Sequence, residues 1–530
     1  MKYFKIFSLA LAATFLFSCK KGFIETKPSQ SVFTTDVFSS LSTARAAVNG
    51  LYSLMQSYSY YGRDAFVIPE VLSDNATRSI KSGNRYTGMN TMTHASTDNN
   101  VSRMWDQMYR VVINANAVID NEEKLKNIVS PLELPELTQL VGEAYAVRAL
   151  VYFDLAKFFS RPLKFTVDGS HLSVPLVLKQ PTTVSEITYP SRNTATEVYT
   201  QIDKDLTEAL TRLPLNSNVI VSGVQDAAWF RVRLNRLSVL ALKTRIAIYK
   251  EDWTTAVATS TEVINSGRYA LYPYASMVQD FRATGNTEAI FEVVNNTNDN
   301  AGSDSYANLC NQQGYGEILA TKQSMNSRST GTTLSTFKGL YEAYSSFDVR
   351  RQFVALGNRN SVGGETNVPL ALKYVNIANF MENLKILRFS EMYLSRAEAL
   401  GRLALLNNDA GSLSSSVNDI NYLRNRRDTA TISKPISASI LPTPPIGSIS
   451  VTAYIDTIML ERRREFALEG QRLFDLNRAK INFVKISSAG SATSRLIQYT
   501  STSSYYNRTI LPIPSGEIAV NKNLVQNPGF

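Results

Sequence analysis

Apolar residues recur at helical spacing along most of the chain. Ala44, Val48, Leu51 and Met55 follow one another at intervals of four, three and four residues, and Met104–Val118 repeats this rhythm. Such spacing places the apolar side chains on one face of a helix. The same pattern predicts helices over 137–158, 198–213, 234–248, 253–264, 386–400, 417–426 and 459–473.

Several of these helices are predicted to form pairs. The sequences around Arg148, Arg245 and Arg396 resemble one another, with small residues placed between Tyr and Leu. Trp253–Ala256, a short turn after Tyr249, resembles the second helix of a tetratricopeptide unit. The arginines are 97 and 151 residues apart, whereas tetratricopeptide repeats have a period of about 34 residues. The predicted fold is therefore mainly α, with helical pairs separated by long irregular insertions.

The insertions differ from the helices in composition. Residues 59–100, 268–380 and 428–450 are rich in Ser, Asn, Thr, Tyr, Gly or Pro. Short β-like runs such as Ala289–Val294 predict a few short strands among them. Binding residues often lie on loops that a rigid body positions, so a ligand site is expected in these insertions.

Tyrosine is prominent in the composition, with 26 residues. A tyrosine ring can stack on the C–H groups of a sugar, while amides and guanidinium groups bind its hydroxyls. Trp105 and Trp253 lie on amphipathic helices and are expected to be core residues. The predicted ligand residues are Tyr60, Tyr61, Asn75, Arg85, Tyr86, Tyr306 and Tyr315.

The N-terminal residues resemble a targeting segment. Two lysines precede an apolar run, Ile6–Phe17, which is too short to span a bilayer as a stable anchor. Leu16–Cys19 resembles a bacterial lipobox, whose cysteine becomes residue one of the mature protein and carries acyl chains such as palmitate. The sequence therefore predicts a signal peptide over 1–18 and a lipid anchor at Cys19. An ordinary cleaved signal that contains a cysteine is the alternative.

Composition limits the classes of function. With 530 residues, 44% of them hydrophobic, the chain can bury a large core, and length alone suggests about three or four domains. Two histidines, and Cys310 as the one thiol left once Cys19 carries lipid, argue against a metal site or a disulfide scaffold, so no cofactor is expected. The net charge of +10 falls to +8 over 512 residues once Lys2 and Lys5 are removed. The remaining basic residues are dispersed, so nucleic-acid binding is not expected.

Common catalytic motifs are missing or incomplete in the sequence. The polar run from Asn296 has Ala301 and Ala307 where an EF-hand loop requires Gly and Glu. The sequence contains no Walker motif and no Gly-x-Ser-x-Gly elbow. The chain is therefore expected not to be an enzyme. A glycoside hydrolase remains an alternative, because its two carboxylates leave no local pattern.

A run of three arginines, Arg462–Arg464, lies between Glu461 and Glu465. These side chains could bind a phosphate or an anionic headgroup. The apolar stripe of Met459, Phe466 and Leu473 instead favours a packed helix in which Glu and Arg pair across one turn.

Several segments together resemble the SusD/RagB family of outer-membrane nutrient-binding lipoproteins. The closest resemblance lies in the charged helix and in the C-terminal end of the chain. The matching segments are Cys19–Pro28, Trp105–Ile119, Arg388–Ala399, Ile420–Arg426, Glu461–Arg478 and Leu511–Phe530.

The resemblance implies about four tetratricopeptide-like helical pairs, formed by an N-terminal region over 19–225 and a C-terminal region over 226–530 that pack as one body. It implies a lipid-anchored protein at the surface of a Gram-negative outer membrane. It also implies a SusC-like TonB-dependent transporter as partner and an oligosaccharide as ligand. A helical scaffold that binds a peptide or a protein is the alternative.

Overall fold

The computed structural model describes residues 38–79, 83–215, 220–221, 224–225, 230–323, 338–358, 365–486, 494–499 and 504–530. The predicted signal peptide and Cys19 lie outside these residues, so the lipid anchor remains a prediction. Within the described part of the chain, no helix is both long and apolar enough to cross a membrane.

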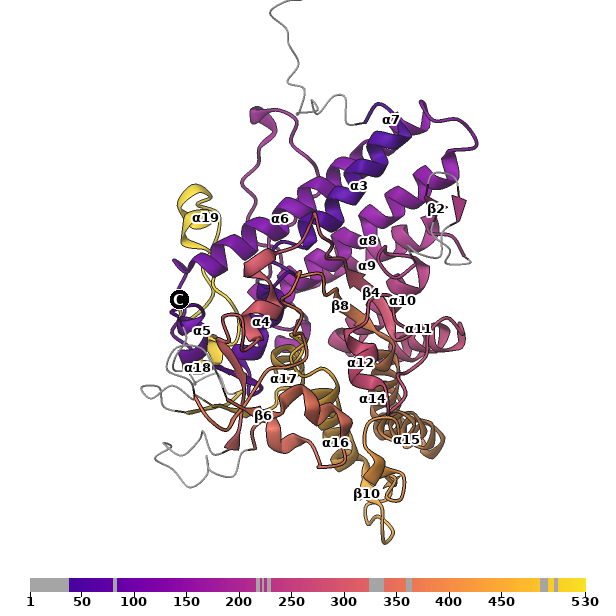
Figure 1. Ribbon diagram of the computed structural model, residues 1–530. Coiled ribbons are helices and arrows are strands. Elements are labelled where there is room, and N and C mark those ends of the chain that lie inside the picture. Colours follow the sequence, from indigo (N-terminus) through magenta and orange to yellow (C-terminus); the bar gives the residue numbers. More distant parts are fainter. Residues whose placement is uncertain are drawn as a thin grey trace, which may run out of the picture.

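Helices that pack against one another in a continuous series form most of the protein (Figure 1). Each helix of the series contacts the next, except that the last, over 451–465, packs mainly on 389–407. Long insertions separate several of these helices in the sequence. The predicted mainly α fold with helical pairs is confirmed. The series runs through α3 (Leu41–Met55), α6 (Asn99–Asp120), α8 (Leu134–Phe159), α9 (Ala195–Arg212), α10 (Arg236–Lys250), α11 (Trp253–Asn265), α14 (Phe389–Asn407), α15 (Ala410–Arg424) and α16 (Val451–Glu465).

Helix boundaries follow the capping residues of the sequence. The Thr194 side chain accepts from the Glu197 backbone N–H, and the Glu197 side chain accepts in return from the Thr194 backbone, so a capping box begins α9. This helix ends at Arg212, two residues before Pro214. α11 ends close to Gly267, whose φ of 66° is the left-handed conformation that favours glycine.

The three arginines in similar sequence surroundings have the same structural role. Each guanidinium binds both oxygens of a carboxylate on another helix. Arg148 of α8 pairs with Asp205 of α9 at 2.6 and 2.8 Å. Arg245 of α10 pairs with Glu391 of α14 at 2.6 Å, and Arg396 of α14 pairs with Asp419 of α15 at 2.7 Å. These two-pronged ion pairs fix how neighbouring helices sit against each other.

The strands are short and occur in pairs, as the sequence predicts. The two longest, β4 (Ala289–Val293) and β8 (Leu384–Arg388), are antiparallel and buried against the helices. The other pairs are β1 (Ala76–Arg78) with β5 (Ile318–Ala320), β2 (Ile220–Val221) with β3 (Val224–Gln225), β6 (Leu356–Gly357) with β7 (Val368–Pro369), β9 (Ala438–Ser439) with β10 (Ile449–Ser450), and β11 (Phe483–Lys485) with β12 (Arg495–Ile497).

Short helices occupy the irregular region. Every residue of α4 (Asp64–Leu72) is buried, so residues 59–100 are not simply a polar surface loop. Cys310, at the end of α13 (Tyr306–Cys310), is 2% exposed and packs in the hydrophobic core. The remaining short helices are α5 (Thr87–Thr91), α7 (Glu122–Lys126), α12 (Met277–Arg282), α17 (Arg472–Ala479), α18 (Ser504–Asn507) and α19 (Ser515–Val520).

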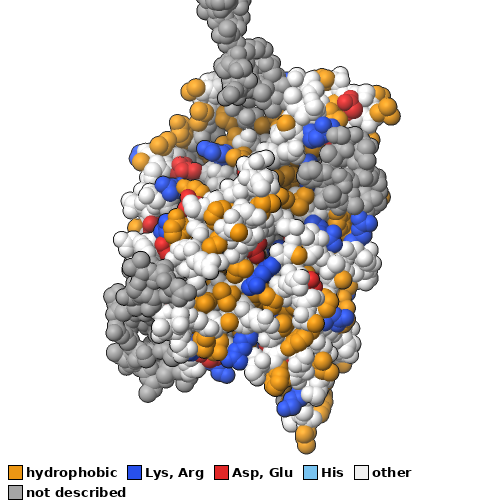
Figure 2. All heavy atoms as spheres, in the orientation of Figure 1, with side chains coloured by type: hydrophobic (Ala, Val, Ile, Leu, Met, Phe, Trp, Pro, Cys, Tyr) orange, Lys and Arg blue, Asp and Glu red, His pale blue; other side chains and the backbone are white. Residues whose placement is uncertain are grey.

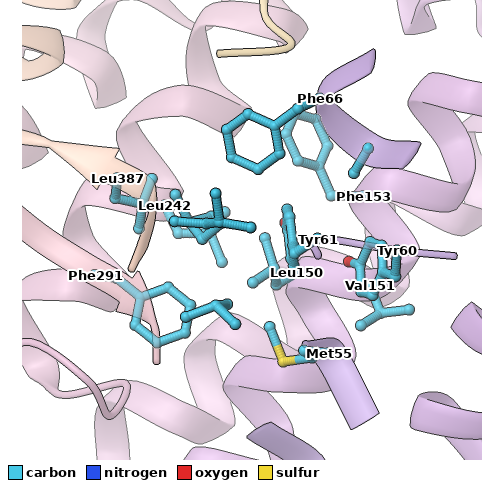
Figure 3. Packing of buried hydrophobic residues seen from close by; sticks show 14 of the residues in the cluster. Met55, Tyr60, Tyr61, Phe66, Leu150, Val151, Phe153, Leu242, Phe291 and Leu387 are labelled. Carbon is cyan, nitrogen blue, oxygen red and sulfur yellow. The ribbon is translucent and has the colours of Figure 1, made fainter. Parts of the chain in front are cut away.

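One hydrophobic cluster joins the N-terminal and C-terminal halves. It extends from Phe38 to Leu524 and includes side chains from α3, α8, α10, β4 and β8. Figure 3 shows Met55 and Tyr61 in the same packed region as Leu150, Leu242 and Phe291. A second, smaller cluster lies between α14, α15 and α16.

The arginine run is structural. Arg462 pairs with Asp475 at 3.0 Å, Arg463 with Asp74 at 3.4 Å, and Arg464 with Glu461 at 3.1 Å. The preference for a packed helix is confirmed, but two of the three carboxylate partners come from other elements rather than from the next turn of the same helix.

The predicted single helix across 459–473 is wrong. α16 ends at Glu465, and α17 begins at Arg472. The connecting turn contains Gly470 at φ 72°, where an added Cβ would lie 2.5 Å from the carbonyl oxygen of Ala65. Only glycine fits this close approach to α4, so the chain turns there instead of continuing the helix.

Candidate functional site

Two of the predicted ligand tyrosines are core residues. The rings of Tyr60 and Tyr61 stack with centroids 4.2 Å apart, and the residues are 0% and 6% exposed. Both hydroxyls donate to Oδ2 of Asp154 in α8, and Lys157 lies 2.7 Å from the other oxygen of this carboxylate. Burial raises the pKa of both phenols. These rings are not available to a sugar, so the ligand role predicted for them does not hold.

Tyr86 and Tyr306 are also buried, at 3% and 1% exposure. The Tyr86 hydroxyl donates to Asp64 at the start of α4, and the Tyr306 hydroxyl donates to the carbonyl of Leu468 at 3.0 Å. Asn75 is equally enclosed. Its amide donates to Glu70 at 3.0 Å and accepts from Arg463 at 2.9 Å. These three residues fasten the insertions to the helical body and do not face a ligand.

The other two predicted residues, Arg85 and Tyr315, lie together at the surface. The Arg85 guanidinium carbon is 4.1 Å from the centroid of the Tyr315 ring. Its Nη1 lies 2.5 Å from Oε1 of Glu317, and its side chain is 37% exposed. Tyr315 is half-buried. A guanidinium on a tyrosine ring forms a flat surface with apolar faces and polar edges.

A second arginine–tyrosine pair lies in the segments that adjoin the first. The Arg63 guanidinium is 4.6 Å from the centroid of the half-buried Tyr58 ring. Arg63 also pairs with Asp304 at 2.9 Å, and the Asp304 side chain is 47% exposed. The sequence did not predict Tyr58, Arg63 or Asp304 as ligand residues. Their only indication in the sequence is that they flank the predicted tyrosines in polar segments. We call the six residues Tyr58, Arg63, Arg85, Asp304, Tyr315 and Glu317 the Arg85 face.

Backbone contacts hold the two halves of the Arg85 face together. β1 and β5 pair Arg78 with Ile318, and the Ser79 N–H donates to the carbonyl of Glu317 at 2.8 Å. The Tyr306 N–H donates to the carbonyl of Gly62 at 3.1 Å. An added Cβ at Gly62 would lie 2.2 Å from the carbonyl oxygen of Gln56, so this turn requires glycine.

Charges on the Arg85 face are balanced. Arg63 is paired with Asp304 and Arg85 with Glu317. Burial alone would lower the pKa of Arg63, but the neighbouring Asp64 and Asp304 carboxylates raise it. On the face of the molecule shown in Figure 2, Lys and Arg side chains are scattered among apolar and uncharged groups. A charge-balanced surface with flat aromatic stacks suits a neutral ligand with many hydroxyls better than a polyanion.

A groove with a volume of about 500 Å³ lies between α6, α19 and residues 175–190. Trp105 and Tyr109 form part of its wall, with ring centroids 4.8 Å apart. Burial, together with the nearby Asp106, raises the pKa of Glu517 in this groove. Apolar side chains are exposed along it, including Ile187 at 47%, Tyr189 at 52% and Val520 at 70%. No pattern in the sequence predicted this groove, although Trp105 itself is buried as expected.

Family models match nearly the whole chain. The model described as the SusD family matches residues 252–530, and one described as "Starch-binding associating with outer membrane" matches residues 22–231. The chain belongs to the SusD family.

Known relatives cover most or all of the chain. It is 23% identical to SusD-like protein P2 of Formosa agariphila over 566 aligned residues, which cover 100% of both chains. It is 24% identical to SusD-like protein P38 of the same organism, over 90% of this chain and 92% of the relative.

Solved structures share the fold. A SusD superfamily protein from Bacteroides thetaiotaomicron superposes with a TM-score of 0.74 at 24% identity, over 92% of this chain and 100% of its own. A protein from Bacteroides vulgatus described as a SusD-like carbohydrate binding protein superposes with a TM-score of 0.70 at 18% identity, over 92% and 97% of the two chains. These similarities establish the architecture.

Proposed function

We propose that this protein binds oligosaccharides at the Arg85 face and delivers them to a SusC-like TonB-dependent transporter of the outer membrane. One observation carries the proposal. Two arginine–tyrosine stacks, Arg85 on Tyr315 and the buried Arg63 on Tyr58, lie on neighbouring segments, and each has a half-exposed tyrosine ring. Their exposed ring surfaces offer flat faces to sugar rings, and the exposed Asp304 carboxylate beside Arg63 can accept hydrogen bonds from hydroxyls.

The family supports this proposal at a coarser level. The model that matches residues 22–231 is described as starch-binding and as associated with the outer membrane. Lipidation of Cys19 would keep the protein at that membrane, because several acyl chains hold a protein on a bilayer far longer than one chain does. We further propose that binding proceeds without cleavage, so that the intact oligosaccharide passes to the transporter.

A panel of oligosaccharides titrated into protein without residues 1–19 tests this function. Heat of binding with unchanged sugar supports the proposal. Shortened sugars in the mixture would instead identify a glycoside hydrolase, and no response to any sugar would contradict oligosaccharide binding.

The groove between α6 and α19 favours a second candidate function, the binding of a peptide or protein. Its exposed Ile187, Tyr189 and Val520 side chains form an apolar surface of the kind that marks interaction sites. A panel of apolar peptides tests it, with Val520→Asp as the variant. Peptide binding that this charge abolishes supports the second candidate, and binding that the charge leaves unchanged contradicts it.

A further inference from the structure

The groove between α6 and α19 has a floor that is apolar on one side and polar on the other. The α6 residues that line it form two adjacent rows, and a spacing of four residues within each row aligns it with the helix axis. The floor is about 14 Å long from Trp105 to Asn114, a length that about four residues of an extended chain cover. The apolar row is Trp105, Tyr109 and Ile113, and the polar row is Asp106, Arg110 and Asn114.

Hydrogen bonds hold the facing wall of the groove, residues 175–190, in place. At one end of this wall, the Tyr109 hydroxyl of α6 donates to the carbonyl of Pro175 at 2.8 Å. At the other end, the amide of Asn521, directly after α19, donates to the carbonyl of Pro190 at 2.8 Å. These bonds tie the wall to both helices, so little ordering of the wall is needed when a ligand binds.

Two carboxylates lie close together at the Trp105 end of the groove. Asp106 belongs to α6 and Glu517 to α19, and both line the groove. Burial raises the pKa of Glu517, the Asp106 charge raises it further, and the indole of Trp105 lowers it through a hydrogen bond. Within the described part of the chain, neither carboxylate forms an ion pair, and no cation lowers the pKa of Glu517. A cation placed between the two carboxylates would therefore stabilise both.

The lining of the groove is negative, although the whole chain carries a net charge of +10. Its charged residues are Asp106, Glu517 and Arg110, so one negative charge is left over. Arg110 is exposed and lies one turn of α6 further along the polar row. Its charge lowers the pKa of Asp106, which partial burial raises. The Trp105 end thus favours a cation, and the surroundings of Arg110 do not.

The rim of the groove is aliphatic on both sides. Ile187, on the wall, is 47% exposed, and Val520, on α19, is 70% exposed. Aliphatic side chains would take sugar hydroxyls out of water without offering them hydrogen bonds, which is unfavourable. They suit the apolar side chains of a peptide, since burial of apolar surface from both partners is favourable.

We propose that this groove binds an extended peptide segment, whose Lys or Arg side chain lies between Asp106 and Glu517 and whose apolar neighbours contact Ile187 and Val520. The inference rests on the second candidate function and adds the charge of the ligand to it. It is independent of oligosaccharide binding, because the groove shares no residue with the Arg85 face.

Fluorescence polarisation with labelled pentapeptides tests the proposal on protein without residues 1–19. The probes are Ala-Ile-Lys-Ile-Ala and its counterparts with Arg, Gln or Glu at the centre. The Lys and Arg peptides should bind about fivefold more tightly than the Gln peptide, as expected for a partly exposed ion pair, and the Glu peptide should bind most weakly. Glu517→Gln should remove most of this preference and leave the Gln peptide unchanged. Asp456→Asn, at an exposed position of α16 outside the groove, is the matched control and should alter neither.

The outcomes separate this inference from the peptide function on which it rests. Equal binding of the Lys and Gln peptides, with the Gln peptide lost in Val520→Asp, would overturn the cation and keep the peptide function. Tightest binding of the Glu peptide would assign the selection of charge to Arg110 and would also overturn the proposal. If no peptide binds, both the peptide function and the proposal fall. If Glu517→Gln fails to fold, Asp106→Asn, at an exposed position, makes the same comparison.

Discussion

The guanidinium of Arg85 lies 4.1 Å above the ring of Tyr315, and Glu317 holds it there through an ion pair of 2.5 Å. Arg85 and Tyr315 are 230 residues apart in the sequence, and β1–β5 pairing brings their segments together. The fold therefore creates this stack, and its stability should depend on both Arg85 and Tyr315.

Replacing Tyr315 with Ala should weaken oligosaccharide binding about tenfold, because one stacking contact is worth up to about 1.4 kcal/mol. Isothermal titration calorimetry measures the change. Tyr422→Ala is the matched control, since Arg426 lies 3.8 Å above the Tyr422 ring in α15, away from the Arg85 face. Equal losses in the two variants would show that the effect is not specific to this face.

Replacing Tyr61 with Phe should leave oligosaccharide affinity unchanged and lower the free energy of unfolding by about 1–3 kcal/mol. The hydroxyl donates to the buried Asp154 carboxylate, and a hydrogen bond to a charged group contributes about that much. Chemical denaturation measures the loss. A variant with normal stability but weakened ligand binding would return Tyr61 to the list of ligand residues.

Stability should fall as the pH drops from about 6.5 towards 4 because of His94. Burial lowers the pKa of His94 from 6.5 to about 4, and its Nε2 lies 3.2 Å from the carbonyl oxygen of Ile510. Between these values the unfolded chain binds a proton that the folded protein does not, so the contribution is complete above pH 6.5 and is lost as the pH falls to about 4. The full loss is about 3 kcal/mol.

The variant His94→Gln should flatten this dependence of the unfolding free energy on pH. His171→Gln is the control, because burial lowers the pKa of His171 in the same direction and the residue is less enclosed. A pH profile of His94→Gln identical to that of the unmodified protein would contradict this assignment.

Substituting Cys19 with Ala should release the protein from membranes into the soluble fraction, because the substitution removes the attachment point of the acyl chains. Membrane fractionation with mass spectrometry of the N-terminal peptide measures both the location and the modification. If the variant stays on the membrane through an uncleaved segment 1–18, the lipoprotein prediction is contradicted.

The helical body could be predicted from the sequence because its signals are local. Apolar spacing located α3, α8 and α11, and Pro214 and Gly267 marked where two helices end. The break at Gly470 could not be predicted, since it depends on the backbone of α4, far away in the sequence.

The candidate site could be predicted only in part. Tyr60 and Arg85 both lie in polar segments and have similar local signals. What separates them is the tertiary partner, because Asp154 of α8 draws Tyr60 into the core while Glu317 holds Arg85 at the surface.

Calorimetric titration of oligosaccharides into the unmodified protein and the double variant Tyr58→Ala/Tyr315→Ala tests the central claim most directly. The account predicts binding of at least one neutral oligosaccharide by the unmodified protein, and a loss of about a hundredfold when both stacks are removed. Undiminished binding by a folded double variant would contradict the claim that the Arg85 face is the ligand site.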